Sequence, residues 1–475
     1  MPPELSQLAR ELLTSLPWSI VLPAGCGKTE LIAAMAASID AGSKPLLVLT
    51  HTNAGVDVVR KRFAKYGVRP DKARVFTLDT WAKLFDDHFP QLGGTANVPE
   101  GTDMWLAAQL RTGRIFDSPH IGDVLTATYS AVIVDEYQDC SDIQHALVVA
   151  MSQHIPVGVL GDPLQGIFAF GAGVVDWPNV EVAFAPKALT PTPHRWATRN
   201  PNLGSWLLAL RPSLVVGATI NLSANGSPIT WRTSDWRAEG AYCIAAANGA
   251  DSQKQIVALR QQPAQCYKFA RGLLGKFHVA EEIECKAVKA LAVALDEGNG
   301  GKLAAAAIKF VKACCIGCPS AFNPALISAY SNGNPKVYNR GNQLAAVYDA
   351  LNALITSPTP QNTKDAITSL RGASQRVFRW EAWRVALQVL DELTYSGGSA
   401  SKGLQDVRNR SRYGGQASTR HTVSRTLLVK GQEYDECIIL GADGMNARNL
   451  YVALSRGIDK VTVFSAQPTI TITDY

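Results

Sequence analysis

The first third of the chain alternates short apolar runs with segments of helical periodicity. The apolar runs are rich in Val, Ile and Leu, and they occupy residues 19–22, 45–49, 73–76, 131–134 and 156–160. Runs of this length, bounded by turn or helix signals, are typical of buried parallel strands. Residues 30–41 and 54–66, which lie between them, have the periodicity of helices. This alternation predicts an α/β fold with a doubly wound sheet.

The middle of the chain has a different pattern. From residue 238 to about 395 the sequence is rich in Ala, Leu, Lys and Gln, and residues 280–295 and 301–313 have helical periodicity. Only short turn-like stretches, at residues 331–335 and 357–361, interrupt it. We therefore predict a mostly helical insertion over residues 238–395.

A segment rich in Gly, Ser and Arg follows at residues 396–420, where several basic residues stand against the single acid Asp406. This composition predicts a mobile basic loop. A solvated linker is the favoured interpretation, and a loop that contacts phosphates is the alternative. Beyond it, residues 436–441 and 460–464 again have the pattern of core strands.

These patterns predict the domain organisation. We expect a first α/β domain at residues 1–187, with a small insertion at about residues 86–128. We expect a second α/β domain to be assembled from residues 188–237 and 421–475, on both sides of the helical insertion. The length of 475 residues agrees, because a single hydrophobic core does not extend over so long a chain.

Composition narrows the class of protein. Hydrophobic residues make up 47% and charged residues 18%, as in soluble globular proteins. No apolar run has the length of a membrane span and the N-terminus has no signal pattern, so we expect no membrane partner and a cytoplasmic location. Nine cysteines without a regular framework indicate reduced thiols. The net charge of +6 permits nucleic-acid binding without establishing it.

The first chemical motif is Pro-Ala-Gly-Cys-Gly-Lys-Thr at residues 23–29, between a predicted strand and a predicted helix. This is the context of a phosphate-binding loop, in which glycines let the backbone wrap a phosphate at a helix N-terminus. Lys28 is expected to reach the β- and γ-phosphates of ATP, and the Thr29 hydroxyl to hold Mg²⁺. The predicted nucleotide-binding residues are Gly25, Cys26, Gly27, Lys28, Thr29 and Glu30. Leu22 stands where the pattern has its first glycine, and an ordinary Gly-rich turn is the alternative.

A second motif is the acidic pair Asp135 and Glu136, which ends the apolar run at residues 131–134. In open α/β sheets ligands bind at the carboxyl ends of the strands. Asp135 is placed to hold Mg²⁺, and Glu136 to orient and deprotonate the attacking water. Acids capping a helix N-terminus are the alternative, which accounts poorly for two acids together.

Further strings follow the phosphate loop in a fixed order: Asp-Glu-Tyr-Gln-Asp at 135–139, Gly-Asp-Pro-Leu-Gln-Gly-Ile-Phe at 161–168, Lys-Gly-Gln-Glu-Tyr-Asp at 430–435 and Leu-Tyr-Val-Ala-Leu-Ser-Arg at 450–456. In this order they resemble the motif series of superfamily 1 helicases, closest to the UvrD/Rep family. The resemblance covers about residues 5–90, 129–211 and 424–466. It implies two RecA-like P-loop NTPase domains, with the helical insertion in the second and ATP in the cleft between them.

The resemblance also assigns roles. Gln165 matches the glutamine that couples the γ-phosphate to the DNA site. Arg195 and Arg456 match two arginine fingers, each typically worth about 10³–10⁵ in rate. Gly431 and Glu433 match a region near the ribose and Mg²⁺.

Gln7 stands close to where the family has its adenine-reading glutamine, and a solvated helix position is the alternative.

Two strings resemble the family's DNA contacts, and two aromatic residues lie where its bases stack. The predicted nucleic-acid residues are Thr50, His51, Thr52, Asn53, Thr80, Trp81, Phe168 and Phe170. Stacking one base contributes about 1–3 kcal/mol, and core packing is the alternative for Phe168 and Phe170. The sequence departs from the family at four places. Asp79 and Leu427 each stand where the family has a histidine, and Gln432 stands where it has a leucine. Residues 171–173 lack the arginine that the family has there. These departures concern DNA contacts and coupling rather than ATP hydrolysis.

Two functions follow from this resemblance. The first is an ATP-dependent translocase or helicase that moves on single-stranded DNA, with 3′→5′ polarity taken from the family. The second is a DNA- or nucleotide-sensing ATPase subunit that regulates a nuclease on another chain, in a defence or repair complex. The short chain and the altered DNA strings favour the second. A nucleotide-binding scaffold without catalysis is disfavoured, because it has no need of Glu136.

One cysteine cluster remains outside this assignment. Cys314, Cys315 and Cys318, with Cys285 or Cys266 upstream, have some of the ligands of a zinc or iron–sulfur site. No second pair of Cys or His stands at ligand spacing. Buried structural thiols are therefore the favoured interpretation.

Overall fold

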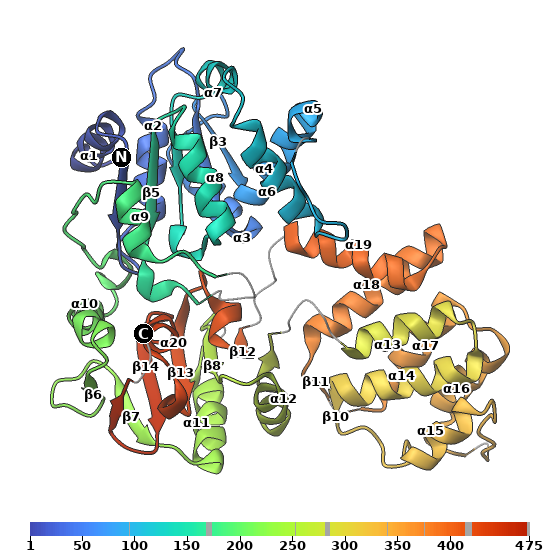
Figure 1. The fold of residues 1–475 in the computed structure, drawn as a ribbon. Coiled ribbons are helices and arrows are strands. Elements are labelled where there is room, and N and C mark those ends of the chain that lie inside the picture. Colours follow the sequence, from blue (N-terminus) through green and yellow to red (C-terminus); the bar gives the residue numbers. More distant parts are fainter. Residues whose placement is uncertain are drawn as a thin grey trace. The chain divides into compact units, whose positions relative to one another are not determined.

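The computed structural model describes residues 1–94, 96–167, 173–251, 253–280, 286–339, 341–374, 376–413 and 420–472, with the backbone alone for 408–413. The chain divides into two compact units. Figure 1 labels the helices and strands along the chain. Unit 1 comprises Met1–Ile229, Gly444–Asp459 and Thr469–Tyr475, and unit 2 comprises Thr230–Asp443 and Lys460–Pro468. Each unit contains a sheet of parallel strands together with helices, which confirms the mixed α/β class.

Unit 1 is built on a parallel sheet of five strands in the order β1-β5-β4-β2-β3. The strands are β1 (Trp18–Val21), β2 (Leu46–Thr50), β3 (Ala73–Thr77), β4 (Val132–Val134) and β5 (Val157–Gly161). They fall on the five apolar runs that predicted strands. A small antiparallel pair joins β6 (Thr219–Asn221) to β15 (Thr469–Thr471).

Helices cover both faces of this sheet, which is why its central strands are apolar on both sides. Alternate residues of β2 enter different hydrophobic clusters: Leu47 and Leu49 join one, Leu46 and Val48 the other. The helices of unit 1 are α1 (Pro3–Thr14), α2 (Lys28–Ala37), α3 (Asn53–Lys65), α4 (Leu78–His88), α5 (Pro90–Gly93), α6 (Met104–Ile115), α7 (Ile121–Thr128), α8 (Asp142–Ser152), α9 (Trp177–Ala183), α10 (Pro201–Val215) and α20 (Ala447–Leu454). Its 3-10 turns are η1 (Tyr137–Asp139), η2 (Pro163–Gln165) and η3 (His194–Trp196).

The division between the units differs from the predicted domain boundary at residue 188. Residues 188–229 and 444–459 pack in unit 1, whereas the sequence pattern placed them in the second domain. Direct contacts explain the difference. The buried indole of Trp196 donates to the carbonyl of Gly457 at 2.8 Å, and the Arg195 amide donates to the carbonyl of Gly25 at 3.1 Å.

Unit 2 contains a sheet of six strands in the order β7-β14-β13-β8-β12-β9. The strands are β7 (Thr230–Thr233), β8 (Ile256–Leu259), β9 (His278–Val279), β12 (His421–Ser424), β13 (Tyr434–Leu440) and β14 (Gly457–Ser465). Strands β13 and β14 match the two predicted core strands to within two or three residues at most ends. Strands β8 and β9 lie inside the predicted helical insertion, because an apolar run of four residues is too short to stand out in Ala-rich surroundings.

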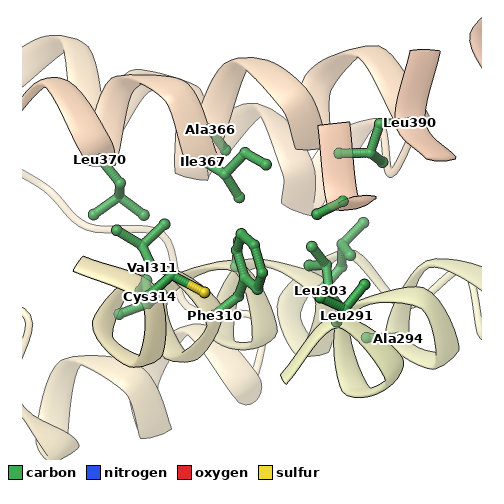
Figure 2. Packing of buried hydrophobic residues seen from close by; sticks show 14 of the residues in the cluster. Leu291, Ala294, Leu303, Phe310, Val311, Cys314, Ala366, Ile367, Leu370 and Leu390 are labelled. Atoms are coloured by element: carbon green, nitrogen blue, oxygen red, sulfur yellow. The ribbon is translucent and has the colours of Figure 1, made fainter. Parts of the chain in front are cut away.

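The helical part of unit 2 starts later than predicted, because α11 (Trp236–Gly249) and α12 (Pro263–Gly272) pack on the sheet. The remaining helices are α13 (Lys286–Asp296), α14 (Gly300–Cys314), α15 (Pro324–Ser331), α16 (Ala345–Thr356), α17 (Pro360–Gly372), α18 (Trp380–Ser396) and α19 (Ala400–Tyr413). They share one apolar core, in which Phe310 and Leu303 of α14 face Ile367 of α17 and Leu390 of α18 (Figure 2). Short elements complete the unit: β10 (Cys315–Ile316), β11 (Arg376–Val377), η4 (Thr426–Val429) and η5 (Ala442–Gly444).

The segment predicted as a basic loop at residues 396–420 is in large part the helix α19, so the loop prediction is wrong for residues 400–413. Ala400, Leu404 and Val407 are buried and form a stripe at helical spacing. The Asp296 carboxylate accepts from the first amides of the helix, Ala400 at 2.6 Å and Ser401 at 2.9 Å. Residues 414–419 lie outside the described residues.

None of the helices in the described part of the chain combines the length and the apolar character that a membrane span requires.

Candidate nucleotide-binding site

The strand order of unit 1 brings three loops together. Strands β1, β5 and β4 are neighbours in the sheet and run parallel, so their carboxyl ends meet at one edge. The phosphate-binding loop follows β1, Asp162 follows β5, and Asp135 follows β4. Three strings that are far apart in the sequence therefore lie side by side.

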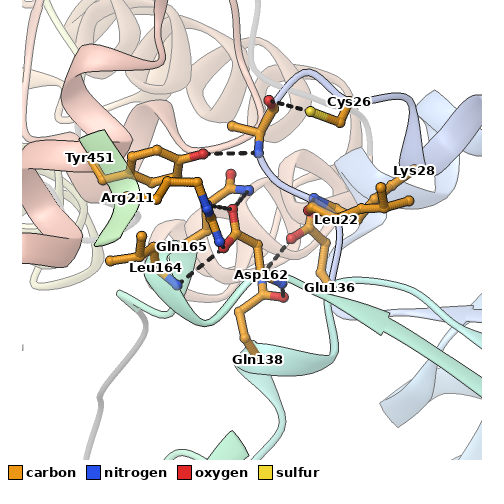
Figure 3. Close-up of polar contacts among 11 residues, drawn as sticks. Leu22, Cys26, Lys28, Glu136, Gln138, Asp162, Leu164, Gln165, Arg211 and Tyr451 are labelled. Carbon is orange, nitrogen blue, oxygen red and sulfur yellow. Dashed lines mark hydrogen bonds and ion pairs between the residues drawn. The ribbon is translucent and has the colours of Figure 1, made fainter. Parts of the chain in front are cut away.

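The loop after β1 has the backbone that a phosphate cradle requires. Gly25 has φ +69° and Gly27 has φ +88°, a left-handed conformation that glycine adopts without a steric penalty. Gly27 also caps the N-terminus of α2, whose first amides face the loop. The Lys28 side chain is buried, and its ammonium donates to the Leu22 carbonyl at 2.8 Å (Figure 3). The residues of this loop therefore fit a nucleotide phosphate.

Other residues of the loop have separate environments. Burial raises the pKa of the Cys26 thiol to about 11, against the opposing charge of Lys28. Thr29, in the first turn of α2, is half-buried.

Glu30, predicted to contact the nucleotide, instead contacts α3. Its carboxylate lies 3.2 Å from the Arg62 guanidinium and accepts from Lys65 and Tyr66 at 2.5 Å each. Burial alone would raise its pKa, but these donors outweigh it and lower the pKa. Glu30 thus ties α2 to α3.

Asp135 ends β4 as a buried carboxylate. Burial raises its pKa to about 7; the charge of Glu136 adds to the rise and that of Lys28 opposes it. Its carboxylate accepts from the Glu136 amide at 2.9 Å. A divalent cation favours an ionised carboxylate, and carboxylate oxygens are the ligands that Mg²⁺ prefers. Asp135 therefore fits the predicted magnesium ligand.

Glu136 occupies an unusual backbone conformation. Its φ of +53° is left-handed, which costs a non-glycine residue about 1–2 kcal/mol. Strain of this kind is retained where the surroundings over-determine it, often at functional sites. The Gln138 amide donates to the Glu136 carboxylate at 2.5 Å. The turn and Gln138 together fix this carboxylate beyond the end of β4.

Asp162 lies at the centre of the polar contacts in Figure 3. It is fully buried, and its carboxylate accepts two hydrogen bonds from Arg211, at 2.7 and 2.9 Å, and one from the Gln165 amide at 2.9 Å. The Asp162 amide donates to the side-chain oxygen of Gln138 at 2.8 Å. Gln138 thereby connects Asp162 to Glu136.

The network also reaches the phosphate-binding loop. The Arg211 guanidinium lies 5.0 Å from the ring centroid of Tyr451, and the Ala24 amide donates to the Tyr451 hydroxyl at 3.2 Å (Figure 3). Tyr451 belongs to α20 and Arg211 to α10. Gln138, Asp162 and Tyr451 lie inside the quoted motif strings but were assigned no role. Arg211 lies in a Leu-rich helix without a motif, so no pattern in the sequence points to it.

The two predicted arginine fingers both lie in unit 1. The Arg195 guanidinium donates to the Ser455 carbonyl at 2.9 Å, and its backbone contacts Gly25. Arg456, two residues beyond the end of α20, is buried and donates to the Val452 carbonyl at 3.0 Å and to the Ser455 hydroxyl at 2.7 Å. The structure thus brings Arg195 to the phosphate-binding loop and holds Arg456 against the C-terminal end of α20.

The remaining nucleotide-binding predictions fall elsewhere. Gln7 is exposed on α1, and its side-chain amide donates to Glu11 at 2.9 Å. Gly431, with φ +81°, and Glu433 belong to unit 2, where both are exposed.

The first predicted nucleic-acid string follows β2, next to β4 at the same edge of the sheet. Thr50 is buried, and the Thr52 hydroxyl caps α3 by accepting from the Gly55 amide at 3.0 Å. Asn53 is the first residue of that helix. The His51 ring lies 3.3 Å from the Cys140 sulfur, so this string touches the segment that carries Asp135 and Glu136.

The second predicted string, after β3, lies in the interior. Thr80 donates its amide to the Thr77 hydroxyl at 3.0 Å. The Trp81 ring is buried and stacks on Phe85 with a centroid distance of 4.8 Å. Apolar packing accounts for the position of Trp81, and its contact with nucleic acid stays a prediction. Phe168 and Phe170 lie outside the described residues.

Asp79, which replaces the family's histidine, is also engaged inside unit 1. Its carboxylate accepts from Gln109 at 2.7 Å and from Gln144 at 2.8 Å. Burial raises its pKa, and these two hydrogen bonds offset part of the rise.

The cysteine cluster lies in unit 2. Cys314 and Cys315 are buried, and the Cys318 sulfur lies 3.2 Å from the Ser374 hydroxyl. Among the described residues, no group of three or more His, Cys, Asp or Glu side chains is arranged to hold a metal ion.

Comparison with known proteins identifies part of the chain. Residues 102–177 match the family model for the UvrD/REP helicase N-terminal domain. One solved structure with an overall likeness is a Pif1 helicase from Bacteroides, in complex with ADP-AlF3 and ssDNA; it is 9% identical, with 97% of this chain and 92% of that chain covered and a TM-score of 0.38. A search of curated proteins found no match. The family match covers Asp135, Glu136 and Gln165, and it supports the resemblance of this part of the chain to UvrD-like helicases of superfamily 1.

Proposed function

We propose that the chain is an ATP-hydrolysing motor that moves on single-stranded DNA. The observation that carries the proposal is the meeting of Lys28, Asp135 and Glu136 at one edge of the unit 1 sheet. A scaffold that only binds nucleotide has no use for a carboxylate held in strained backbone beside the magnesium ligand. The family match over residues 102–177 supports a DNA helicase or translocase in general.

The residues divide the chemistry among them. The backbone of the loop and Lys28 bind the phosphates of ATP, while Thr29 and Asp135 hold the Mg²⁺ that neutralises phosphate charge. Glu136 orients a water molecule in line with the γ-phosphate and accepts its proton. Gln165 reports the state of the γ-phosphate, and Arg195 and Arg456 stabilise charge on the transferred group.

The strand order suggests how hydrolysis is coupled to DNA. The string after β2 is the predicted strand contact, and His51 touches Cys140, five residues after Asp135. A change at the acidic pair therefore has a short path to the DNA string, through five residues of the chain and the contact between Cys140 and His51. The 3′→5′ polarity that we propose comes from the family resemblance.

ATP hydrolysis, with and without single-stranded DNA, tests the proposal in the wild type and in Glu136→Gln. We expect DNA to stimulate hydrolysis in the wild type, and Glu136→Gln to lower kcat by about 10²–10⁴-fold, the usual contribution of a general base. Nucleotide binding should persist. Glu100→Gln, an exposed acid of unit 1, should leave kcat unchanged. Hydrolysis that is indifferent to both DNA and Glu136→Gln would refute the proposal.

One observation favours a second function, in which the ATPase senses DNA or nucleotide and regulates a nuclease on another chain. Trp81 is buried and Asp79 is bound by two glutamines, so one predicted DNA string presents no side chain suited to separating strands. Duplex substrates with a 3′ or a 5′ single-stranded tail distinguish the two. Unwinding of the 3′-tailed duplex by the purified chain supports the motor; DNA-stimulated hydrolysis without unwinding supports the sensor.

A further inference from the structure

Arg211 has no place in the motif series, yet it contacts two of the strings that form the site. Its guanidinium forms an ion pair with Asp162, which follows β5, and lies over the ring of Tyr451, whose hydroxyl accepts from the Ala24 amide. Figure 3 shows the guanidinium between the carboxylate and the ring. All these residues belong to unit 1.

The geometry of the contact fixes orientation as well as charge. Both Asp162 oxygens accept from Arg211, one from each terminal nitrogen, at 2.7 and 2.9 Å. A bidentate pair of this kind sets the plane of the carboxylate, and the flat guanidinium can still stack on an aromatic ring. Lysine offers a single point charge and cannot supply both contacts.

The carboxylate that Arg211 orients has a second task. Asp162 is fully buried and also accepts from the side-chain amide of Gln165 at 2.9 Å and from the Leu164 backbone at 3.2 Å. An unpaired buried carboxylate is costly, so loss of Arg211 would force Asp162 to rearrange. Because the Gln165 amide is bound to the same carboxylate, it would move as well.

We propose that Arg211 is a positioning residue. Through Asp162 it orients Gln165, and through Tyr451 it holds the phosphate-binding loop in place beside Gln165. The inference rests on the proposed function in taking Gln165 as the residue that reports the γ-phosphate. Arg211 lies outside the motifs, and it couples the motif after β5 to the loop after β1. It acts through these neighbours and not by contact with the reacting atoms.

Kinetics of Arg211→Gln and Arg211→Lys give the first test. We expect kcat for ATP to fall by roughly 10–100-fold in both, because misplacing a catalytic group by about 1 Å costs up to about 10²-fold, while KM changes little. The matched control is Arg199→Gln, which removes a partly exposed ion pair with Asp459 in the same unit. It should leave kcat unchanged.

A double-mutant cycle separates positioning from general damage. If Arg211 acts through Gln165, then Arg211→Gln should lower kcat by a clearly smaller factor in a Gln165→Ala background than in the wild type, and the remaining effect is the part that acts through Tyr451 and the loop. Effects of the two substitutions that multiply in full would overturn the inference, since they would show that Arg211 acts independently of Gln165.

Amide hydrogen exchange gives a readout that does not depend on ATP hydrolysis. In Arg211→Gln the amides of Ala24 and Leu164 should exchange roughly fivefold faster or more, the effect of weakening one hydrogen bond by about 1 kcal/mol. Tyr451→Phe, which removes only the hydroxyl that accepts from Ala24, should speed the exchange of the Ala24 amide and leave that of Leu164 unchanged. This variant also serves if Arg211→Gln does not fold.

Unchanged exchange in both variants would overturn the inference. A wild type without ATPase activity would overturn the proposed function alone, because the exchange result still decides whether Arg211 connects the two loops.

Discussion

At the scale of single residues, Gly25 shows how tightly the phosphate-binding loop is enclosed. A methyl group at this position would lie 2.6 Å from the Trp196 ring and 2.8 Å from the Arg195 side chain, and φ is +69°. We expect Gly25→Ala to lower the free energy of unfolding by about 2–5 kcal/mol, from about 1–2 for the left-handed backbone and about 1–3 for overpacking. Urea denaturation measures this loss, and nucleotide affinity should fall with it.

Gly42→Ala is the matched control for backbone strain. Gly42 also has positive φ, at +84°, but a methyl group there meets nothing within 4 Å. It should cost about 1–2 kcal/mol, the backbone contribution alone. An equal loss of unfolding free energy in the two variants would contradict the close packing of η3 against the loop.

The residues that the sequence predicted are those whose role is local. Gly27, Lys28 and Asp135 could be recognised because strand, glycine loop and helix follow one another, and because acids at the end of an apolar strand need a partner. Arg211 could not, since its contacts with Asp162 and Tyr451 arise only where α10, α20 and the segment after β5 meet in the fold. The burial of Trp81 could not be predicted either, because it depends on Phe85 and Phe116, which the family string does not contain.

At the scale of elements, β13 carries a buried carboxylate whose ionisation stabilises the sheet of unit 2. Glu436 accepts from Lys254 at 2.9 Å and from the Tyr242 hydroxyl at 3.1 Å, and Lys460 lies 3.2 Å away. Burial alone would raise its pKa, but the hydrogen bond from Lys254 and the charge of Lys460 outweigh it and lower the pKa. The fold therefore favours the ionised form.

The sign of the pH dependence follows from this lowered pKa. The stabilisation is present above the pKa of the unfolded chain, about 4.3, and is lost as the pH falls through the lower value of the fold. We expect Glu436→Gln to lower the free energy of unfolding by about 1–3 kcal/mol at pH 7, and the gap to the wild type to close as the pH falls below 4.3. Urea denaturation at a series of pH values measures both.

A surface ion pair provides the control for Glu436. Glu297 pairs with Lys302 at 3.2 Å, with 47% and 56% of the side chains exposed, so Glu297→Gln should cost less than about 1 kcal/mol at any pH. A pH-independent loss in Glu436→Gln would mean that the side chain matters for packing and not for its charge.

Elements also show where composition misleads. The segment 400–413 has the Gly, Ser and Arg content of a linker, yet it forms α19 because three apolar residues and Asp296 of another helix support it. The support comes from outside the segment, so its own composition could not predict it. The five strands of the parallel sheet in unit 1, by contrast, are mostly apolar, and each was located within about one or two residues.

At the scale of the whole molecule, the hydrophobic clusters of the helical part and of the unit 1 sheet share no residue. Phe310, which is 1% exposed and stacks on Trp383, lies in the helical cluster. We expect Phe310→Ala to cost about 3–5 kcal/mol through the lost transfer energy and the cavity. Because the damage is confined to one core, hydrogen exchange should speed up in α14, α17 and α18 and stay unchanged in β1, β4 and β5.

Val337→Ala, at a side chain that is 85% exposed, is the control and should alter neither the free energy of unfolding nor the exchange rates. Faster exchange in the unit 1 strands of Phe310→Ala would show instead that the two cores unfold as a single cooperative unit, and that the stability of the nucleotide site depends on the helical core.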